Sequence, residues 1–252
     1  MGAILQTSGL SKSFGRLAAL DGVTLDVEEK KVTILIGPNG SGKTTLINVV
    51  MGLYKPDAGS VLFGSTDITG WPPHRLYKKG LARTFQIPTL FWDLTVLENI
   101  LVAAKGNPGE SFLKAPFRRS WVKAEEEEVA AAGKIIALLG LSAQWDKLAY
   151  QLSGGQMKLL EVGRALMSGA KFLLLDEPIS GVNPTLAHEI FARIIRLRDE
   201  LGISFFIVEH RLDIALSYVD YVHVMAFGKL LTSGKPEAVM SDDRVIEAYL
   251  GA

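Results

Sequence analysis

The stretch Gly37-Pro38-Asn39-Gly40-Ser41-Gly42-Lys43-Thr44-Thr45 decides the fold of this chain. It matches the phosphate-binding pattern G-x-x-x-x-G-K-(S/T) at every fixed position. The apolar residues 32–36 precede it and predict a buried strand, and residues 46–50 follow it and predict a helix. Because the pattern forms a phosphate-binding loop between a strand and a helix, this context favours such a loop over a glycine-rich turn that ends in Lys-Thr by chance.

The residue types of this loop are those that a phosphate chain requires. Its glycines allow the backbone to wrap tightly and to aim its N–H groups inward, and the N-terminus of the following helix adds partial positive charge. Lys43 supplies a point charge for the β- and γ-phosphates, and Thr44 supplies a hydroxyl for Mg²⁺.

Length and composition bound the class of protein. At 252 residues the chain is long enough for one large α/β domain with a subdomain. Lys plus Arg and Asp plus Glu number 27 each, so a nucleic-acid binder, which usually carries a basic excess, is disfavoured. There is no cysteine, which excludes disulfides and thiolate metal sites and fits a reducing compartment.

The sequence also bears on location. No apolar stretch reaches the ~18 residues that span a bilayer, and the N-terminus lacks a basic segment followed by an apolar run. We therefore expect a cytoplasmic protein.

Alternating segments along the chain predict an α/β fold. Residues 3–36 are β-rich, 59–63 predict a short strand, and Pro72-Pro73 open a helix that ends near Gly80. Residues 81–85 predict a strand that ends at Gln86. After residue 150, apolar strands at 172–175 and 203–208 flank a helix at 184–200, and two short strands follow within 220–234, around Phe227-Gly228. This alternation predicts a mostly parallel sheet with helices on both faces.

The middle of the chain differs in amino-acid composition from the segments on either side. Residues 88–121 are rich in proline and aromatic residues, and 122–139 predict an amphipathic helix. We interpret its acidic run, 125–128, as a solvated face near the helix N-terminus and not as a metal site. The predicted domains are residues 1–86 and 151–252 as the core with an N-terminal antiparallel β subdomain, and 87–150 as an inserted helical subdomain whose last motif continues to about 168.

Polar residues follow two of the predicted strands. Asp176 and Glu177 end one apolar strand, and His210 follows another. Ligands of open α/β sheets bind at these strand ends. There a carboxylate can hold Mg²⁺, a second can orient an attacking water, and a histidine can reach the same phosphate. An acidic strand-end turn and a structural histidine are the alternatives.

A second motif, Leu152-Ser153-Gly154-Gly155-Gln156, opens the helix predicted at 157–167. Ser153 is placed as its N-cap, and the glycines allow close approach of an anion to the helix N-terminus. One triphosphate does not need two such cradles in one chain. We therefore expect this cradle to close over a nucleotide held by another subunit.

Together these motifs resemble the nucleotide-binding subunits of ABC transporters over the whole length and in the family's order. Residues 37–45 match the Walker A loop, Gln86 the Q-loop glutamine, 152–156 the signature motif, and 172–176 Walker B. Glu177 matches the catalytic glutamate, 180–184 the D-loop and His210 the switch histidine. Phe14 falls where the family stacks an aromatic ring on adenine. Asn183 stands where many members have Asp, which bears only on detail of the contact between subunits.

The resemblance implies an ATPase with ATP and Mg²⁺ as its ligands. Lys43, Gln86, Glu177 and His210 would be catalytic, and Thr44, Gln86 and Asp176 would hold Mg²⁺. Phe14 and residues 37–45 (Gly37, Pro38, Asn39, Gly40, Ser41, Gly42, Lys43, Thr44, Thr45) would bind the nucleotide. Residues 152–156 (Leu152, Ser153, Gly154, Gly155, Gln156) would bind the ATP of a partner cassette, identical or paralogous.

Within the family, residues 152–164, 177–184, 209–213 and 244–251 resemble importers of branched-chain amino acids and related polar substrates. This implies transmembrane permease partners, docking through residues 87–120, and a peripheral position on the inner face of the cell membrane. The alternative is a soluble ABC-type ATPase of an assembly system, such as the iron–sulfur cluster type, which keeps every nucleotide motif. The aromatic and proline-rich segment 88–121 favours the importer.

Overall fold

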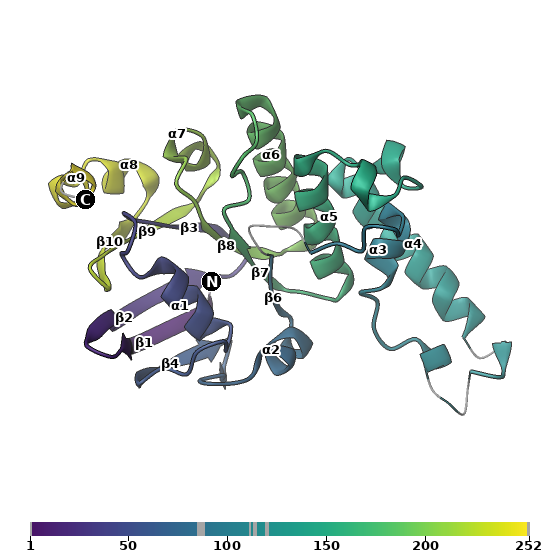
Figure 1. The fold of residues 1–252 in the computed structure, drawn as a ribbon, viewed down its shortest axis with the longest axis horizontal. Coiled ribbons are helices and arrows are strands. Elements are labelled where there is room, and N and C mark those ends of the chain that lie inside the picture. Colours follow the sequence, from purple (N-terminus) through teal and green to yellow (C-terminus); the bar gives the residue numbers. More distant parts are fainter. Residues whose placement is uncertain (1, 85–88, 111, 113–114, 119–120, 251–252) are drawn as a thin grey trace.

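In a computed structural model, the structure describes residues 2–84, 89–110, 112, 115–118 and 121–250 (Figure 1). Within these residues the strands form a four-stranded sheet of order β2-β1-β4-β5 and a six-stranded sheet of order β10-β9-β3-β8-β7-β6. The first sheet is antiparallel, and the second is parallel except where β10 pairs with β9. The strands are β1 (Ala3–Phe14), β2 (Leu17–Glu28), β3 (Val32–Ile36), β4 (Ala58–Phe63), β5 (Thr66–Asp67), β6 (Leu81–Arg83), β7 (Phe172–Asp176), β8 (Ser204–Val208), β9 (Tyr221–Ala226) and β10 (Lys229–Gly234).

Helices follow most strands of the larger sheet. The α-helices are α1 (Lys43–Val50), α2 (Pro73–Lys79), α3 (Val96–Leu101), α4 (Val122–Leu139), α5 (Gly154–Met167), α6 (Pro184–Leu201), α7 (Leu212–Ala215), α8 (Pro236–Met240) and α9 (Asp243–Leu250). Short 3₁₀ turns lie at η1 (Pro108–Glu110), η3 (Ser142–Gln144), η4 (Ala149–Gln151) and η5 (Leu216–Tyr218).

The central strands β3, β7 and β8 are buried on both faces, which explains their nearly unbroken apolar sequences. Alternate residues point to opposite layers. Ile34 and Leu173 belong to a core with helices α3 to α6, whereas Leu35 and Leu174 belong to a core with α1 and the four-stranded sheet. Figure 1 shows these two layers on either side of the larger sheet.

The register of the central strands brings distant residues to one edge. Leu35 of β3 pairs with Val208 of β8, and Val208 pairs with Asp176 of β7. The three strands run parallel, so the segments that leave them start side by side. This edge is where ligands of open α/β sheets bind.

Helices α3, α4 and α5 pack against one another in a lobe at one end of the molecule (Figure 1). Gly163 permits the close approach, because a Cβ there would lie 2.7 Å from Leu139 Cδ1 and 3.1 Å from Ile100 Cδ1. Thr95 and Glu98 form a reciprocal cap at the N-terminus of α3. The boundaries at 86/87 and 150/151 stay predictions.

The predicted α/β class, antiparallel N-terminal sheet and mostly parallel main sheet are confirmed. Helix α4 has the predicted bounds. Helix α1 begins at Lys43, earlier than the apolar residues from 46 onward indicated, because the loop itself turns into the helix at Gly42. Strand β6 ends at Arg83, before the predicted end; Phe85 and Gln86 lie outside the described residues.

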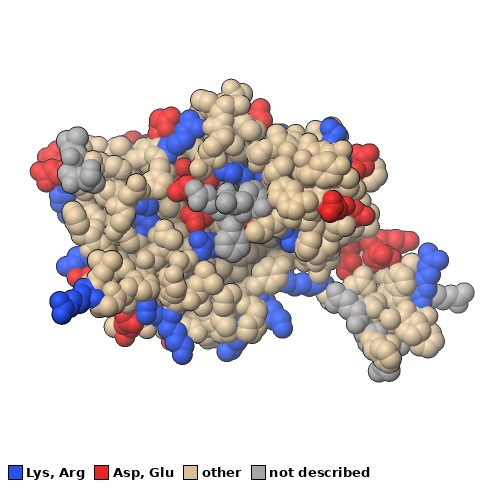
Figure 2. Space-filling model, in the orientation of Figure 1, with Lys and Arg blue, Asp and Glu red and all other residues tan. Residues whose placement is uncertain are grey.

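Charged side chains are spread over the face of the molecule shown in Figure 2. On the face shown in Figure 2, basic and acidic side chains are interspersed, and the basic ones do not gather into one continuous field. A basic stripe of the kind that tracks a nucleic-acid backbone is not seen on this face.

The buried amide side chain of Asn99 stabilises the helical lobe. The Asn99 side chain is fully buried; its Nδ2 donates to the carbonyls of Phe91, Leu94 and Thr95 at 2.9, 3.1 and 3.0 Å, and its Oδ1 accepts from Phe91 N at 3.0 Å. We expect Asn99→Ala to lower the free energy of unfolding by about 2–4 kcal/mol, because it leaves buried backbone groups without partners. Urea denaturation measures this.

The control is Gln6→Ala, a truncation at an exposed position of β1. It should change the free energy of unfolding by no more than about 0.5 kcal/mol. Equal urea midpoints for the two variants would contradict the role given to Asn99.

Candidate active site

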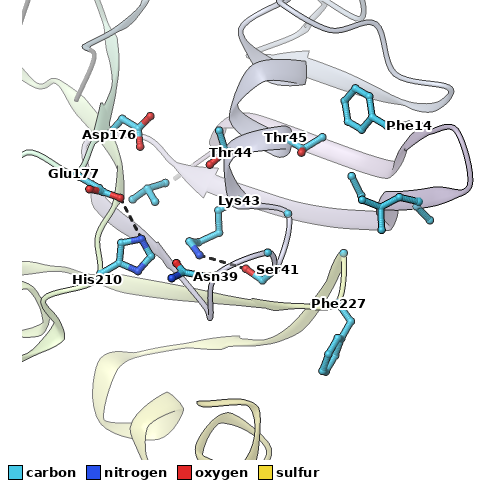
Figure 3. Close-up of a pocket in the computed structure, with 17 residues that line it drawn as sticks. Phe14, Asn39, Ser41, Lys43, Thr44, Thr45, Asp176, Glu177, His210 and Phe227 are labelled. Atoms are coloured by element: carbon cyan, nitrogen blue, oxygen red, sulfur yellow. Dashed lines mark hydrogen bonds and ion pairs between the residues drawn. The ribbon is translucent and has the colours of Figure 1, made fainter. Parts of the chain in front are cut away.

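A cleft of about 560 Å³ lies at the edge where β3, β7 and β8 end (Figure 3). The loop before α1 forms one wall, the ends of β7 and β8 form another, and the β1–β2 and β9–β10 turns close the far end. The lining residues are Phe14, Leu17, Ala18, Ala19, residues 39–45, Asp176, Glu177, Val208, His210, Phe227 and Gly228.

The shape of the loop depends on glycine at two positions. Gly37 has φ +147°, and a Cβ there would lie 2.1 Å from the carbonyl oxygen of Met225. Gly42 has φ +102°, and its Cβ would lie 2.5 Å from the carbonyl oxygen of Ala19. L side chains rarely adopt these conformations, and here the neighbouring backbone leaves no room for one. The loop is therefore pressed against β9 and the β1–β2 segment.

Helix α1 presents its N-terminus to the cleft. Its N-cap, Gly42, provides no side-chain hydrogen bond, and its first turn carries no acidic residue. The first N–H groups of the helix are therefore left for a ligand, and the helix dipole favours an anion there.

Lys43 is held inside the loop. Its Nζ donates to the carbonyls of Gly37 and Pro38 at 2.7 and 2.9 Å and to Ser41 Oγ at 3.4 Å. Burial lowers the pKa of Lys43 below that of an ordinary lysine, and the nearby charges of Glu177 and Asp176 oppose that shift. An ammonium so placed attracts phosphate oxygens.

Asp176 ends β7 and is paired with a strand neighbour. Its Oδ2 lies 2.6 Å from Nη2 of Arg83 on β6, and Nη1 of Arg83 donates to Asn48 Oδ1 at 2.7 Å. Both side chains are mostly buried. This ion pair fixes the carboxylate beside α1.

Glu177 and His210 lie side by side on the wall formed by the ends of β7 and β8, and their side chains point toward each other (Figure 3). The distance from His210 Nε2 to Glu177 Oε1 is 3.2 Å. Glu177 has φ +49°, an uncommon conformation for a non-glycine residue, and its N–H donates to the Val208 carbonyl at 2.8 Å. Such backbone strain concentrates at functional sites, so it supports a functional role for the residue.

The glycine-rich motif at 152–156 lies elsewhere. Ser153 caps α5: its Oγ accepts from Gln156 N at 3.4 Å, and Gln156 Oε1 accepts from Ser153 N at 3.0 Å. Ser153 and Gly154 are exposed, and none of the five residues is among those found to line the cleft. The glycine-rich N-termini of α1 and α5 therefore lie at separate places in the structure.

Two aromatic rings stand at the far end of the cleft. Phe14 is partly exposed and packs edge-on against Tyr54, with ring centroids 5.3 Å apart. Phe227 is 85% exposed in the tight β9–β10 turn, with φ +49°. Phe14 was expected from the sequence. For Phe227 the sequence predicted only a place between two short strands.

The structure brings most predicted site residues together. Phe14, residues 39–45, Asp176, Glu177 and His210 share the cleft, and Gly37 and Pro38 hold Lys43 through their carbonyls. Gln86 lies outside the described residues. Two contacts were not predicted: that of Arg83 with Asp176, and that of the Lys158 ammonium with the backbone that follows Asp176.

Comparison with protein-family models gives two matches. A model described as ABC transporter matches residues 20–180. A second, described as branched-chain amino acid ATP-binding cassette transporter, matches residues 229–252, which include β10, α8 and α9.

Individual relatives extend the similarity to the full chain. A probable branched-chain amino acid transport ATP-binding protein LivG of Archaeoglobus fulgidus is 51% identical over 99% of this chain and 96% of its own length. Its counterpart in Methanocaldococcus jannaschii is 49% identical over 98% and 97%. Among solved structures, the ADP conformation of an ATP-binding cassette from an ABC transporter is 48% identical over all of both chains, with a TM-score of 0.86.

The loop contains glycines with no space for a Cβ, such as Gly37, and glycines with open space, such as Gly40, and this difference allows a stability test. We expect Gly37→Ala to lower the free energy of unfolding by about 3 kcal/mol or more, because the new Cβ would collide with the Met225 carbonyl. Gly40→Ala is the matched control: its φ is +77°, but no atom lies within 4 Å of its Cβ, so only the conformational cost of about 1–2 kcal/mol remains. Thermal and urea unfolding without nucleotide measure both; a larger effect at Gly40 would contradict the packing described.

Proposed function

This chain belongs to the ABC transporter family of ATP-binding cassettes, and we propose that it is the ATP-hydrolysing subunit of an importer for branched-chain amino acids or related small polar substrates. The observation that carries the proposal is the single cleft shared by the phosphate-binding loop and the Glu177–His210 pair. The substrate class is supported by the match at 229–252 and by the names of the full-length relatives.

We assign ATP binding to the loop and its flanking residues. The backbone N–H groups of residues 39–45 and the N-terminus of α1 would surround the phosphates, with Lys43 on the β- and γ-phosphates. Phe14, partly exposed at the far end of the cleft, is placed to stack on the base.

Magnesium suits the oxygen donors of this site. Thr44 and Asp176 line the cleft with hard oxygen ligands, and Gln86 would complete the set. Among the described residues no group of three or more His, Cys, Asp or Glu side chains could hold a metal, which suits an ion that keeps water and phosphate ligands. When bound, Mg²⁺ would neutralise charge on the phosphates.

The chemical step follows from the positions of Glu177 and His210. In hydrolysis, a water oxygen attacks the γ-phosphorus as the bond to the bridging oxygen of ADP breaks. We assign Glu177 to orient that water and accept its proton, and His210, 3.2 Å from Glu177, to hold the carboxylate and contact the γ-phosphate. Positioning and charge neutralisation supply most of the rate.

The second cradle requires a second cassette. Ser153 and Gly154 are exposed at the N-terminus of α5, outside the cleft of their own chain. We propose that two cassettes, identical or paralogous, pack head to tail so that Ser153 and Gly155 of each close over the ATP of the other. Closure and reopening would move the attached permease subunits.

The attachment to the membrane would come from partners. No helix among the described residues is long and apolar enough to span a bilayer. The docking segment 87–120 exposes Phe91, Trp92, Phe112 and Phe117, with Phe112 92% exposed. We propose that this segment binds transmembrane permease subunits and places the cassette on the inner face of the membrane.

Replacing one carboxylate tests the ATPase mechanism. We expect Glu177→Gln to lower ATP turnover at least about 100-fold, because the amide cannot accept the proton of the attacking water. ATP binding should be retained, since the loop and Lys43 are unchanged. Steady-state phosphate release with Mg²⁺ and equilibrium binding of ATP measure the two effects, and removal of Mg²⁺ by EDTA should stop turnover of the unmodified protein.

Glu189→Gln, the same change at an exposed position of α6, is the control and should leave turnover unchanged. Turnover of Glu177→Gln at the level of the unmodified protein would overturn the role assigned to Glu177.

Capture from detergent-solubilised native membranes tests the partner. With this chain as bait we expect a multi-spanning permease to be recovered. Trp92→Ala should reduce recovery, whereas Trp145→Ala, equally a tryptophan on the lobe and 52% exposed but outside 87–120, should not. Recovery of soluble assembly factors alone would instead support the iron–sulfur assembly type of ATPase.

A further inference from the structure

The loop that carries Glu177 is held from the helix of the 152–156 motif. Lys158 lies on α5, just after the motif, and its Nζ donates to the carbonyls of Ser180 and Glu177 at 2.6 and 3.2 Å. The side chain is half-buried, and burial lowers the pKa of its ammonium while the charges of Glu209, Glu177 and Glu161 oppose that shift. A single cation thus holds both ends of the turn 177–180.

A buried carboxylate holds the same turn from the opposite side. Glu209, 1% exposed at the end of β8, accepts from Ile179 N at 2.8 Å through Oε1. Its Oε2 accepts from the N–H groups of His210 and Arg211 at 3.0 and 3.4 Å. The turn is therefore fixed between α5 and the segment that carries His210, and its backbone carbonyls and N–H groups face opposite charges.

The motif helix meets the same region at a second point. A Cβ on Gly155 would lie 2.5 Å from Leu186 Cδ2 in the first turn of α6, so the two helices approach closely here. Leu186 N donates to Asn183 Oδ1 at 2.9 Å, which caps α6 at the end of residues 180–183. Figure 1 shows α5 beside α6. Residues 177–186 thus lie against α5 at two points, at Glu177 and Ser180 through Lys158 and at Leu186 beside Gly155.

We propose that Lys158 is a positioning residue for Glu177: it ties the loop of the proposed catalytic carboxylate to the helix that presents Ser153 and Gly155 to a partner's nucleotide. The inference rests on the proposed function. A shift of α5 on engaging that nucleotide would pull on the Glu177 and Ser180 carbonyls directly. Glu209 holds the other side of the turn to the end of β8. A shift of α5 would therefore change the orientation of the Glu177 side chain.

The test separates positioning from nucleotide binding and from folding. In Lys158→Met, which keeps the length of the side chain and removes the charge, we expect kcat to fall about 100-fold while the ATP affinity changes little. Lys158→Arg should restore most of the kcat, because a guanidinium can still donate to two carbonyls. Lys134→Met, the same change at an exposed position of α4, is the control and should behave as the unmodified protein.

Hydrogen–deuterium exchange provides a readout that does not depend on activity. In Lys158→Met the amides of residues 177–183 should exchange about tenfold faster, with residues 39–45 unchanged. Unchanged exchange at 177–183, or a loss of ATP affinity equal to the loss of kcat, would overturn the positioning role. If the unmodified protein itself fails to hydrolyse ATP, the proposed function falls, and the exchange result alone decides whether Lys158 holds the loop.

Discussion

The parallel register of β3, β8 and β7 is the constraint on which the site depends. Because Leu35 is aligned with Val208, and Val208 with Asp176, the residues that leave these strands start at one edge. The register brings together segments that lie far apart in the chain, namely residues 37–45, Glu177 and His210. A slip of one residue in one strand would move each of its side chains into the opposite core, so the close packing of the two cores holds the alignment.

Charged groups around the cleft are held by the main chain and by partners from neighbouring strands. Asp176 faces Arg83, Glu209 faces three backbone N–H groups, and Lys158 faces two carbonyls. A buried charge is tolerated when such groups replace its hydration. Two of these contacts also fix geometry, since Lys158 connects α5 to the turn 177–180 and Glu209 connects the same turn to the end of β8. These contacts hold the charged side chains around the cleft in place, which is the arrangement that the proposed catalysis would require.

The sequence allowed the fold class, the order of elements and most of the cleft to be predicted, because glycine patterns and apolar runs report local backbone and burial. It predicted that Ser153 caps α5 and that α4 spans 122–139. The contacts of Arg83 and Lys158 could not be predicted, since each joins residues distant in sequence through side chains with many alternative partners. The turn at Phe227 was placed, but its left-handed backbone was not, because Phe rarely adopts that conformation.

The carbonyl contacts of Lys43 bear on how tightly its loop would hold a phosphate. With Gly37 and Pro38 at 2.7 and 2.9 Å, the ammonium is already solvated by its own loop. A phosphate bound at the proposed site would therefore exchange one set of acceptors for another. Such an exchange would moderate the affinity of the loop for phosphate. It suits a motor that must release what it binds as readily as it captures it.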